Sequence, residues 1–177
     1  MIQTPADIQL WNEFKSNFER GALGDIQKAL EARIGAGTIA LTIVAMESLS
    51  GYHAGQHADR STFEPFVRDY MGAYSALAGE LYACVRNGLL HDYRLKTNGG
   101  RRFLITLGDG EFHLKPLLGD PSTTFLNSMA LARDFLAAHA DGLDQVQALF
   151  AQVFDTAGTR NLVWGRAAER GHGGGGV

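Results

Sequence analysis

Apolar residues recur at helical spacing through most of the chain, and three patterns predict helices. The first follows TPAD at 4–7, where threonine can cap a helix, proline suits the first turn and aspartate favours the positive end. The second runs from Asp25 to about Tyr52, with Gly35 inside it as a candidate kink. The third starts at STFE, residues 61–64, which fits a capping box. These patterns predict a helical bundle.

One segment departs from the helical period. RRFLITLGDGEFHLK, residues 101–115, alternates apolar and polar residues on both sides of GDG, which is typical of a β-hairpin with His113 as an ordinary strand residue. Two further helices are predicted over about 122–139 and 142–155. We therefore expect a mainly all-α fold of about four to five helices with one inserted β-hairpin near 102–115.

No internal repeat or linker divides the chain. We expect a single domain over 1–160, followed by a C-terminal tail over 161–177 that is glycine-rich and disordered at its end.

Composition and charge narrow the class of protein. The chain has 177 residues, 45% of them hydrophobic, and a formal net charge of −3, so any polyanion site must be local. Its only cysteine, Cys84, excludes an intrachain disulfide. The apolar run at 34–46 is short of the roughly 18–20 residues that cross a bilayer, and the N-terminus does not resemble a signal peptide. We expect a cytoplasmic protein without membrane contact.

Polar groups are concentrated at the end of the third helix, in LYACVRNGLLHDY, residues 81–93. On a wheel of about 100° per residue, Asn87 and His91 share one arc with Glu80, and Arg86 lies about 140° from His91. While the helix stays regular, contact between the arginine and the histidine therefore requires the helix to end near the glycine between them, or a second chain.

The spacing alone is weak evidence for a site. A similar pair, Arg133 and His139, occurs in RDFLAAH. In a purely structural interpretation, Asn87 and His91 cap the helix C-terminus and Arg86 pairs with an acidic residue.

In its context, however, the segment resembles the Arg-x4-6-His motif of HEPN-type domains, with Arg86, Asn87 and His91 matching position by position. The resemblance implies a helical bundle. Many HEPN-type proteins are metal-independent endoribonucleases, often toxins or defence proteins, and act as dimers; others have lost catalysis and serve as binding or interaction modules. The resemblance therefore implies RNA cleavage or RNA binding, with a catalytically inactive interaction module as the alternative. The implied partners are an RNA substrate, a second copy of the chain and, for a toxin, a cognate antitoxin protein. No cofactor is expected.

The chemistry of these residues is compatible with RNA cleavage. Histidine can move protons near neutral pH, and arginine can bind a phosphate. Asparagine can orient either group. One histidine cannot be base and acid in one step, and a two-fold dimer would supply a second. Glu80, Asp92 and Tyr93 are candidate supporting residues.

Other candidates stay open. Glu47 interrupts an apolar helix and either pairs with Arg86, orienting its guanidinium, or faces solvent. His53 and His57 have the i, i+4 spacing of a metal pair, so a metal-binding helical bundle is a further hypothesis. Cys84 is interpreted as a buried structural thiol rather than a nucleophile.

Overall fold

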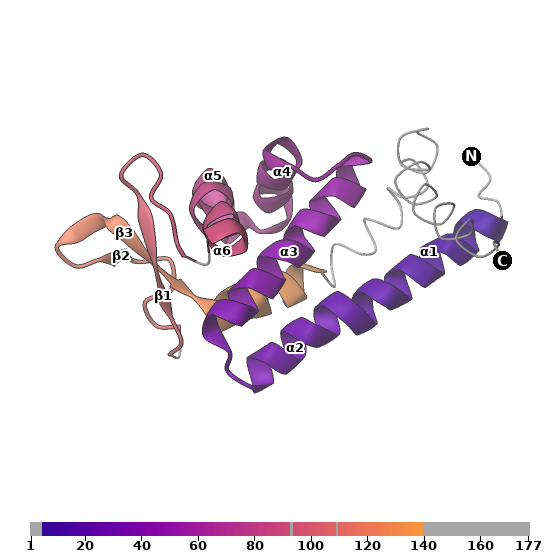
Figure 1. Ribbon diagram of the computed structural model, residues 1–177, viewed down its shortest axis with the longest axis horizontal. Coiled ribbons are helices and arrows are strands. Elements are labelled where there is room, and N and C mark those ends of the chain that lie inside the picture. The colour runs from indigo at the N-terminus through magenta and orange to yellow at the C-terminus, as the bar shows by residue number, and fades with distance from the viewer. Residues whose placement is uncertain (1–4, 93, 109, 140–177) are drawn as a thin grey trace, which may run out of the picture.

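The computed structural model describes residues 5–92, 94–108 and 110–139 (Figure 1). Over these residues the chain is mainly helical and carries one small mixed sheet, which confirms the predicted fold class. None of the described helices is long and apolar enough to cross a bilayer. The helix predicted over 142–155 and the tail over 161–177 lie outside the described residues.

The N-terminal half forms two helical arms that lie side by side. Helix α1 (Pro5–Phe18) continues through a π turn, η1 (Glu19–Leu23), into α2 (Gly24–Glu31). The chain then reverses into α3 (Gly35–Ala54), which runs back along the first arm (Figure 1).

The single helix predicted from Asp25 to Tyr52 is therefore wrong. Arg33 adopts a left-handed conformation, with a φ of 53°, so the helix is interrupted between α2 and α3. Gly35 starts α3 where a Cβ would press on the side chain of Leu107, so the glycine marks a close approach to the β insert.

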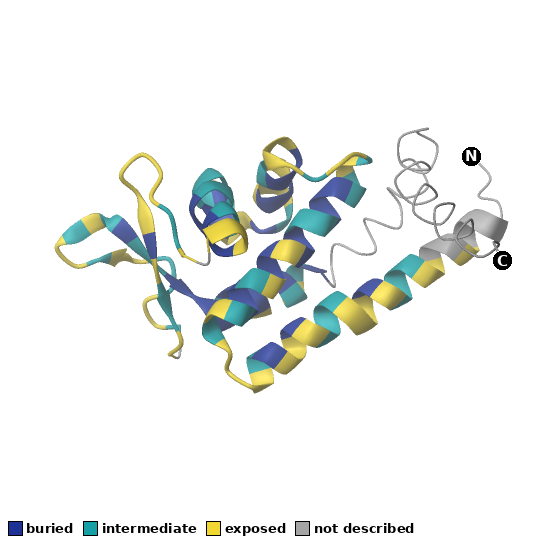
Figure 2. Ribbon diagram, in the orientation of Figure 1, coloured by how far each residue is buried: buried dark blue, intermediate teal, exposed yellow. Residues whose placement is uncertain are grey.

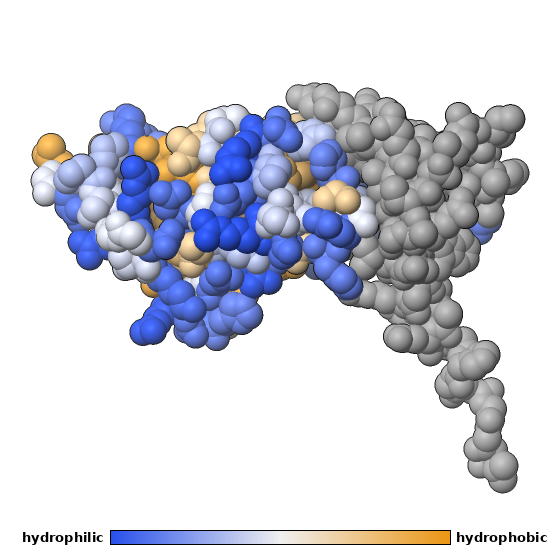
Figure 3. All heavy atoms as spheres, turned by 90° about the horizontal axis from the view of Figure 1, so that it is seen from above, coloured by the Kyte–Doolittle hydropathy of each residue, from blue (hydrophilic) through white to orange (hydrophobic). Residues whose placement is uncertain are grey.

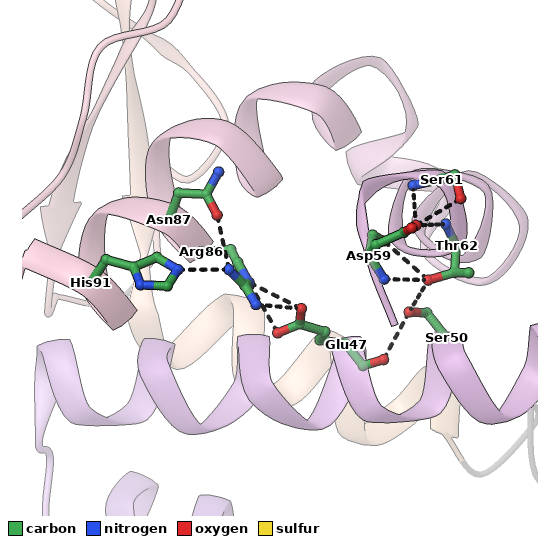
Figure 4. Close-up of polar contacts among 8 residues, drawn as sticks. All are labelled: Glu47, Ser50, Asp59, Ser61, Thr62, Arg86, Asn87 and His91. Carbon is green, nitrogen blue, oxygen red and sulfur yellow. Dashed lines mark hydrogen bonds and ion pairs between the residues drawn. The ribbon is translucent and has the colours of Figure 1, made fainter. Parts of the chain in front are cut away.

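Helix α4 (Arg60–Tyr70) has its capping box two residues before the predicted one. Its N-cap is Asp59, whose carboxylate accepts hydrogen bonds from the N–H groups of Ser61 and Thr62 at 2.7 and 3.2 Å. The Thr62 hydroxyl in turn accepts from the Asp59 N–H at 3.0 Å. Ser50 of α3 hydrogen-bonds Thr62 at 3.2 Å, which joins the two helices (Figure 4).

The predicted third helix is interrupted rather than continuous. It leaves α-helical geometry at Met71, where φ is −126° and ψ is 63°. The chain then proceeds through a 3-10 segment, η2 (Gly72–Leu77), and a single turn, α5 (Ala78–Glu80). A π segment, η3 (Leu81–Arg86), leads into α6 (Asn87–Asp92).

The core lies between α3, α4 and η3. Exposed positions follow the outer edge of α1 and α2 and the loops of the sheet (Figure 2). The fully buried apolar side chains include Ile39, Ile43, Met46, Phe63, Val67, Leu81, Val85 and Phe135.

The β insert lies where the sequence predicts, but its pairing differs from an antiparallel hairpin. Strand β1 (Arg102–Thr106) runs parallel to β3 (Asp120–Asn127), and the short β2 (Pro116–Leu117) pairs antiparallel with β3, giving the order β1-β3-β2. The second predicted strand is instead a turn. Because β3 occupies the start of the helix predicted over 122–139, that helix begins at 128 and is described as far as 139.

His113 anchors this insert to the helical core. Its Nδ1 accepts the Asn127 N–H at 3.0 Å, so the neutral ring carries its proton on Nε2 and donates to the Tyr74 hydroxyl at 2.7 Å. That hydroxyl donates to Asp134 of the helix over 128–139, also at 2.7 Å. Burial lowers the pKa of His113 and raises the pKa of Tyr74. The histidine is thus a junction between three parts of the fold.

This junction predicts a pH-dependent stability. The folded pKa of His113 lies below its ordinary value of about 6.5, so the unfolded chain takes up the proton first as pH falls. The free energy of unfolding should decline below about pH 6.5 and level off below the folded pKa. Burial also lowers the pKa of His53, which adds a decline of the same sign.

Urea unfolding between pH 8 and pH 5 measures this dependence. His113→Asn should flatten part of the decline, because it removes the titrating ring, and His57→Asn in an exposed loop should leave it unchanged. Equal pH slopes for the wild type and His113→Asn would contradict the proposed junction.

Candidate functional site

The site is built on the π segment η3. We refer to η3 and α6 together, Leu81–Asp92, as the motif helix. The Asn87 N–H bonds the carbonyl of Tyr82, five residues earlier, instead of the four of an α-helix. The regular wheel does not hold across this widened turn. Arg86 at its end reaches His91 within one chain while the helix continues through α6, so the predicted need for a helix end or a second chain is wrong.

The Arg86 guanidinium donates hydrogen bonds to four side-chain atoms (Figure 4). Its Nε lies 3.0 Å from both carboxylate oxygens of Glu47, and its Nη2 lies 2.7 Å from Oε1. Its Nη1 donates to the Asn87 Oδ1 at 3.0 Å and to the His91 Nε2 at 2.9 Å. The structure therefore shows the first of the two alternatives for Glu47, its pairing with Arg86, and brings together all three motif residues.

These contacts determine the tautomer of His91. A guanidinium has only N–H donors, so the His91 Nε2 must be the acceptor. A neutral His91 then carries its proton on Nδ1. Within the described residues, Asn87 and His91 bond the guanidinium through their side chains and do not cap helix carbonyls, which disfavours the structural interpretation.

The arginine is held firmly, yet the site stays open to solvent. The side chains of Arg86 and Glu47 are 21% and 13% exposed, whereas His91 is an exposed residue. The Tyr82 ring lies 5.3 Å from the guanidinium carbon, in a cation–π arrangement. Hydrogen bonding to Glu47 raises the pKa of Arg86, so the guanidinium remains a cation at physiological pH.

The chain returning from α6 packs against the same helix. The Arg94 N–H bonds the Gly88 carbonyl at 3.2 Å, and the Lys96 N–H bonds the Cys84 carbonyl at 3.0 Å. A Cβ on Gly88 would collide with the Arg94 carbonyl oxygen and lie 2.9 Å from the Lys96 nitrogen. Glycine is required here because two backbone segments meet.

Of the candidate supporting residues, Glu47 contacts Arg86, whereas Glu80 and Asp92 pair with other side chains. Glu80 forms an ion pair with Arg101 at 3.6 Å, and Asp92 pairs with Lys96 at 2.7 Å. The shared arc predicted for Glu80, Asn87 and His91 assumed a regular helix, which the π segment η3 interrupts. Tyr93 lies outside the described residues.

The two histidines of the metal hypothesis have different surroundings. Helix α3 ends at Ala54, so His57 lies in a loop and the pair has no helical i, i+4 geometry. The His53 Nε2 is 2.9 Å from the Tyr70 hydroxyl. Among the described residues, no three His, Cys, Asp or Glu side chains are grouped as metal ligands.

Cys84 is fully buried, and burial raises the pKa of its thiol. Both properties favour a structural role over a nucleophilic one.

Sequence reasoning missed two parts of the site. Tyr82 was not singled out, although its position four residues before Arg86 is a usable signal for a cation–π pair. The close approach at Gly88 had no such signal, because it depends on where the chain returns after α6.

Comparison with known proteins gives no assignment: no family model, no curated protein and no solved structure matches this chain. The functional argument therefore depends on the geometry described above.

The packing at Gly88 makes a direct prediction. Gly88→Ala should lower the free energy of unfolding by about 1–3 kcal/mol, the usual cost of overpacking, because the new methyl group displaces the returning chain. Gly72→Ala is the matched control, since a Cβ there meets no atom within 4 Å. Chemical denaturation measures both. A Gly88→Ala protein as stable as the Gly72→Ala control would contradict this packing.

Proposed function

We propose that this protein is a HEPN-like, metal-independent endoribonuclease, of a toxin or defence system, with Arg86, Asn87 and His91 as its site. The supporting observation is the 2.9 Å contact between the Arg86 Nη1 and the His91 Nε2 at a solvent-accessible position. This contact places a phosphate-binding cation beside a group that can accept a proton. The motif resemblance supplies the reaction class.

The reaction is attack of a ribose 2′-oxygen on the neighbouring phosphorus. The O2′–P bond forms and the P–O5′ bond breaks, leaving a 2′,3′-cyclic phosphate and a free 5′-hydroxyl. A base takes the proton from O2′, an acid gives one to O5′, and a cation stabilises the charge on the non-bridging oxygens.

His91 is assigned as the base and Arg86 as the cation. In the free protein the lone pair of the His91 Nε2 accepts from Arg86, so it is not available to a hydroxyl. When the Nη1 group turns toward a phosphate oxygen, that lone pair becomes free. Substrate binding would thus release the base at the place where it is needed.

Glu47 and Asn87 are assigned as positioning residues. The carboxylate holds the Nε edge of the guanidinium, which leaves the Nη1 edge directed toward Asn87 and His91. Replacing one partner on that edge by a phosphate costs little reorientation, because the other contacts keep the guanidinium in place.

The acid for the leaving oxygen is assigned to a second copy of the chain. His91 is exposed on its own protomer, and a two-fold dimer that pairs the two motifs would bring a second histidine to the phosphate.

A non-catalytic interaction module is the second candidate. It is favoured by the near-complete internal pairing of the guanidinium, since Glu47, Asn87 and His91 together engage four of its five N–H groups. An arginine so fully paired could serve only to join α3 to the motif helix.

Cleavage of RNA in EDTA separates the two candidates. His91→Ala should reduce the rate by about 10²- to 10⁴-fold, and Arg86→Ala by about 10²- to 10³-fold, as for loss of an acid–base group and of an oxyanion donor. Products should carry 2′,3′-cyclic phosphate ends. His57→Ala, in an exposed loop, is the control and should cleave at the wild-type rate.

Because Arg86→Ala leaves the Glu47 carboxylate without its partner, the double variant Glu47→Gln/Arg86→Ala should be assayed beside it. A folded double variant with undiminished cleavage would overturn the assignment of Arg86. Cleavage that requires added zinc or manganese would overturn the metal-independent mechanism, and no cleavage of any RNA by the wild type would favour the interaction module.

A further inference from the structure

Basic side chains are concentrated between the motif helix and the sheet. Residues 94–102, RLKTNGGRR, contain four of the 16 lysine and arginine residues of the chain and no aspartate or glutamate. We name them the basic segment. Since the whole chain has a formal net charge of −3, this concentration of positive charge is local.

Backbone contacts hold the start of the basic segment against the site. Arg94 and Lys96 donate their N–H groups to the carbonyls of Gly88 and Cys84, one on each side of the π-turn exit. The segment then forms a tight loop at Gly99 and Gly100, which both have positive φ, and enters β1. It therefore connects the motif helix directly to the sheet (Figure 1).

The basic side chains remain accessible in spite of their ion pairs. Lys96 pairs with Asp92, Arg101 with Glu80 and Arg102 with Asp120, at 2.7, 3.6 and 2.7 Å. These three cations are 39%, 59% and 58% exposed. Exposed pairs of this kind contribute little to stability, so phosphate groups can share or replace the carboxylates. The loop at Gly99 and Gly100 projects upward in Figure 1. Seen from that side, the described surface is mostly hydrophilic (Figure 3).

An exposed aromatic ring continues the same surface onto the sheet. Leu104 lies two residues after Arg102 on β1, so the two side chains lie on the same face of the sheet. Leu104 is in register with Phe125 of β3. The Phe112 ring lies 5.7 Å from the Phe125 ring and is 55% exposed. The Lys115 ammonium lies 5.9 Å from the Phe112 ring centre. A cation beside an exposed ring is typical of surfaces that stack unpaired bases.

We infer that the basic segment and Phe112 form the binding path for a single-stranded stretch of RNA next to the cleaved phosphate. The inference rests on the proposed ribonuclease function and specifies its substrate. The segment binds the backbone phosphates, and Phe112 stacks a base. The strand is single because a base inside a duplex has no free face for Phe112, and because the 2′-oxygen must rotate into line with the leaving oxygen.

Salt-dependent binding tests the basic segment. A labelled single-stranded RNA is titrated by fluorescence anisotropy with protein carrying His91→Ala, which prevents cleavage. Adding Arg94→Gln, Lys96→Gln and Arg101→Gln should reduce the slope of log K against log salt by about 0.7 per lost phosphate contact, hence about 2 in all.

A triple control on the helices is matched in charge. The control carries Arg20→Gln, Lys28→Gln and Arg68→Gln, so it loses the same number of positive charges. Like the basic-segment variant it loses two exposed ion pairs, those of Lys28 with Asp25 and of Arg68 with Glu64. This control should retain the parent slope. Phe112→Ala should weaken single-strand binding about fivefold or more, whereas Leu118→Ala, fully exposed in the neighbouring turn, should not.

The outcomes separate this inference from the proposed function. Equal binding by the two triple variants, with wild-type RNA cleavage intact, would overturn the binding path and leave the ribonuclease standing. Tighter binding of duplex than of single strand would also overturn it. If only the basic-segment variant loses RNA binding, and the wild-type protein cleaves no RNA, the binding path would be supported and the ribonuclease function overturned. Absence of any RNA binding would overturn both.

Discussion

The ion pair between Glu47 and Arg86 joins the central helix α3 to the π turn of the motif helix. A carboxylate on a helix as apolar as α3 has a high desolvation cost, which the bidentate guanidinium offsets. The same pairing fixes the rotation of the guanidinium. Once its Nε edge faces Glu47, its Nη1 edge faces Asn87 and His91, so the local geometry of the site follows from one contact between two helices.

The backbone supports this contact from the other side. The π turn brings Arg86 and His91 within reach, and the chain that leaves α6 returns against it because Gly88 has no side chain. The basic segment is therefore placed beside the site by main-chain hydrogen bonds. Its position does not depend on the surface ion pairs, so its charges can serve binding without a cost in stability.

The sequence predicted what depends on local pattern or on elementary energetics. Helix α1 lies where the apolar spacing predicts a helix. The cost of an unpaired carboxylate on an apolar helix left two alternatives for Glu47, and the structure shows the pairing with Arg86. The mainly helical class follows from periodicity. The mechanistic roles of Arg86, Asn87 and His91 are proposals that the motif resemblance suggests.

Features that depend on distant parts of the chain could not be predicted. The parallel pairing of β1 with β3 joins segments separated by a turn and a second strand, and nothing in the alternation of residues specifies it. Similarly, His113 lies in a turn rather than in the predicted strand, and its bonds to Asn127 and Tyr74 join segments far apart in the sequence. The pairing of Glu80 with Arg101 could not be predicted because it joins α5 to the segment just before β1, 21 residues later in the chain.

The most direct test of the hydrogen bond from Arg86 to His91 is to determine which ring nitrogen of neutral His91 carries the proton. Long-range nitrogen–proton NMR correlation on uniformly labelled protein, at a pH where the ring is neutral, distinguishes the two tautomers. The account predicts a proton on Nδ1, with the Nε2 resonance typical of an acceptor, because Arg86 can only donate. In Glu47→Gln the preference should weaken. A His91 that carries its proton on Nε2 in the wild type would contradict the arrangement on which the site is built.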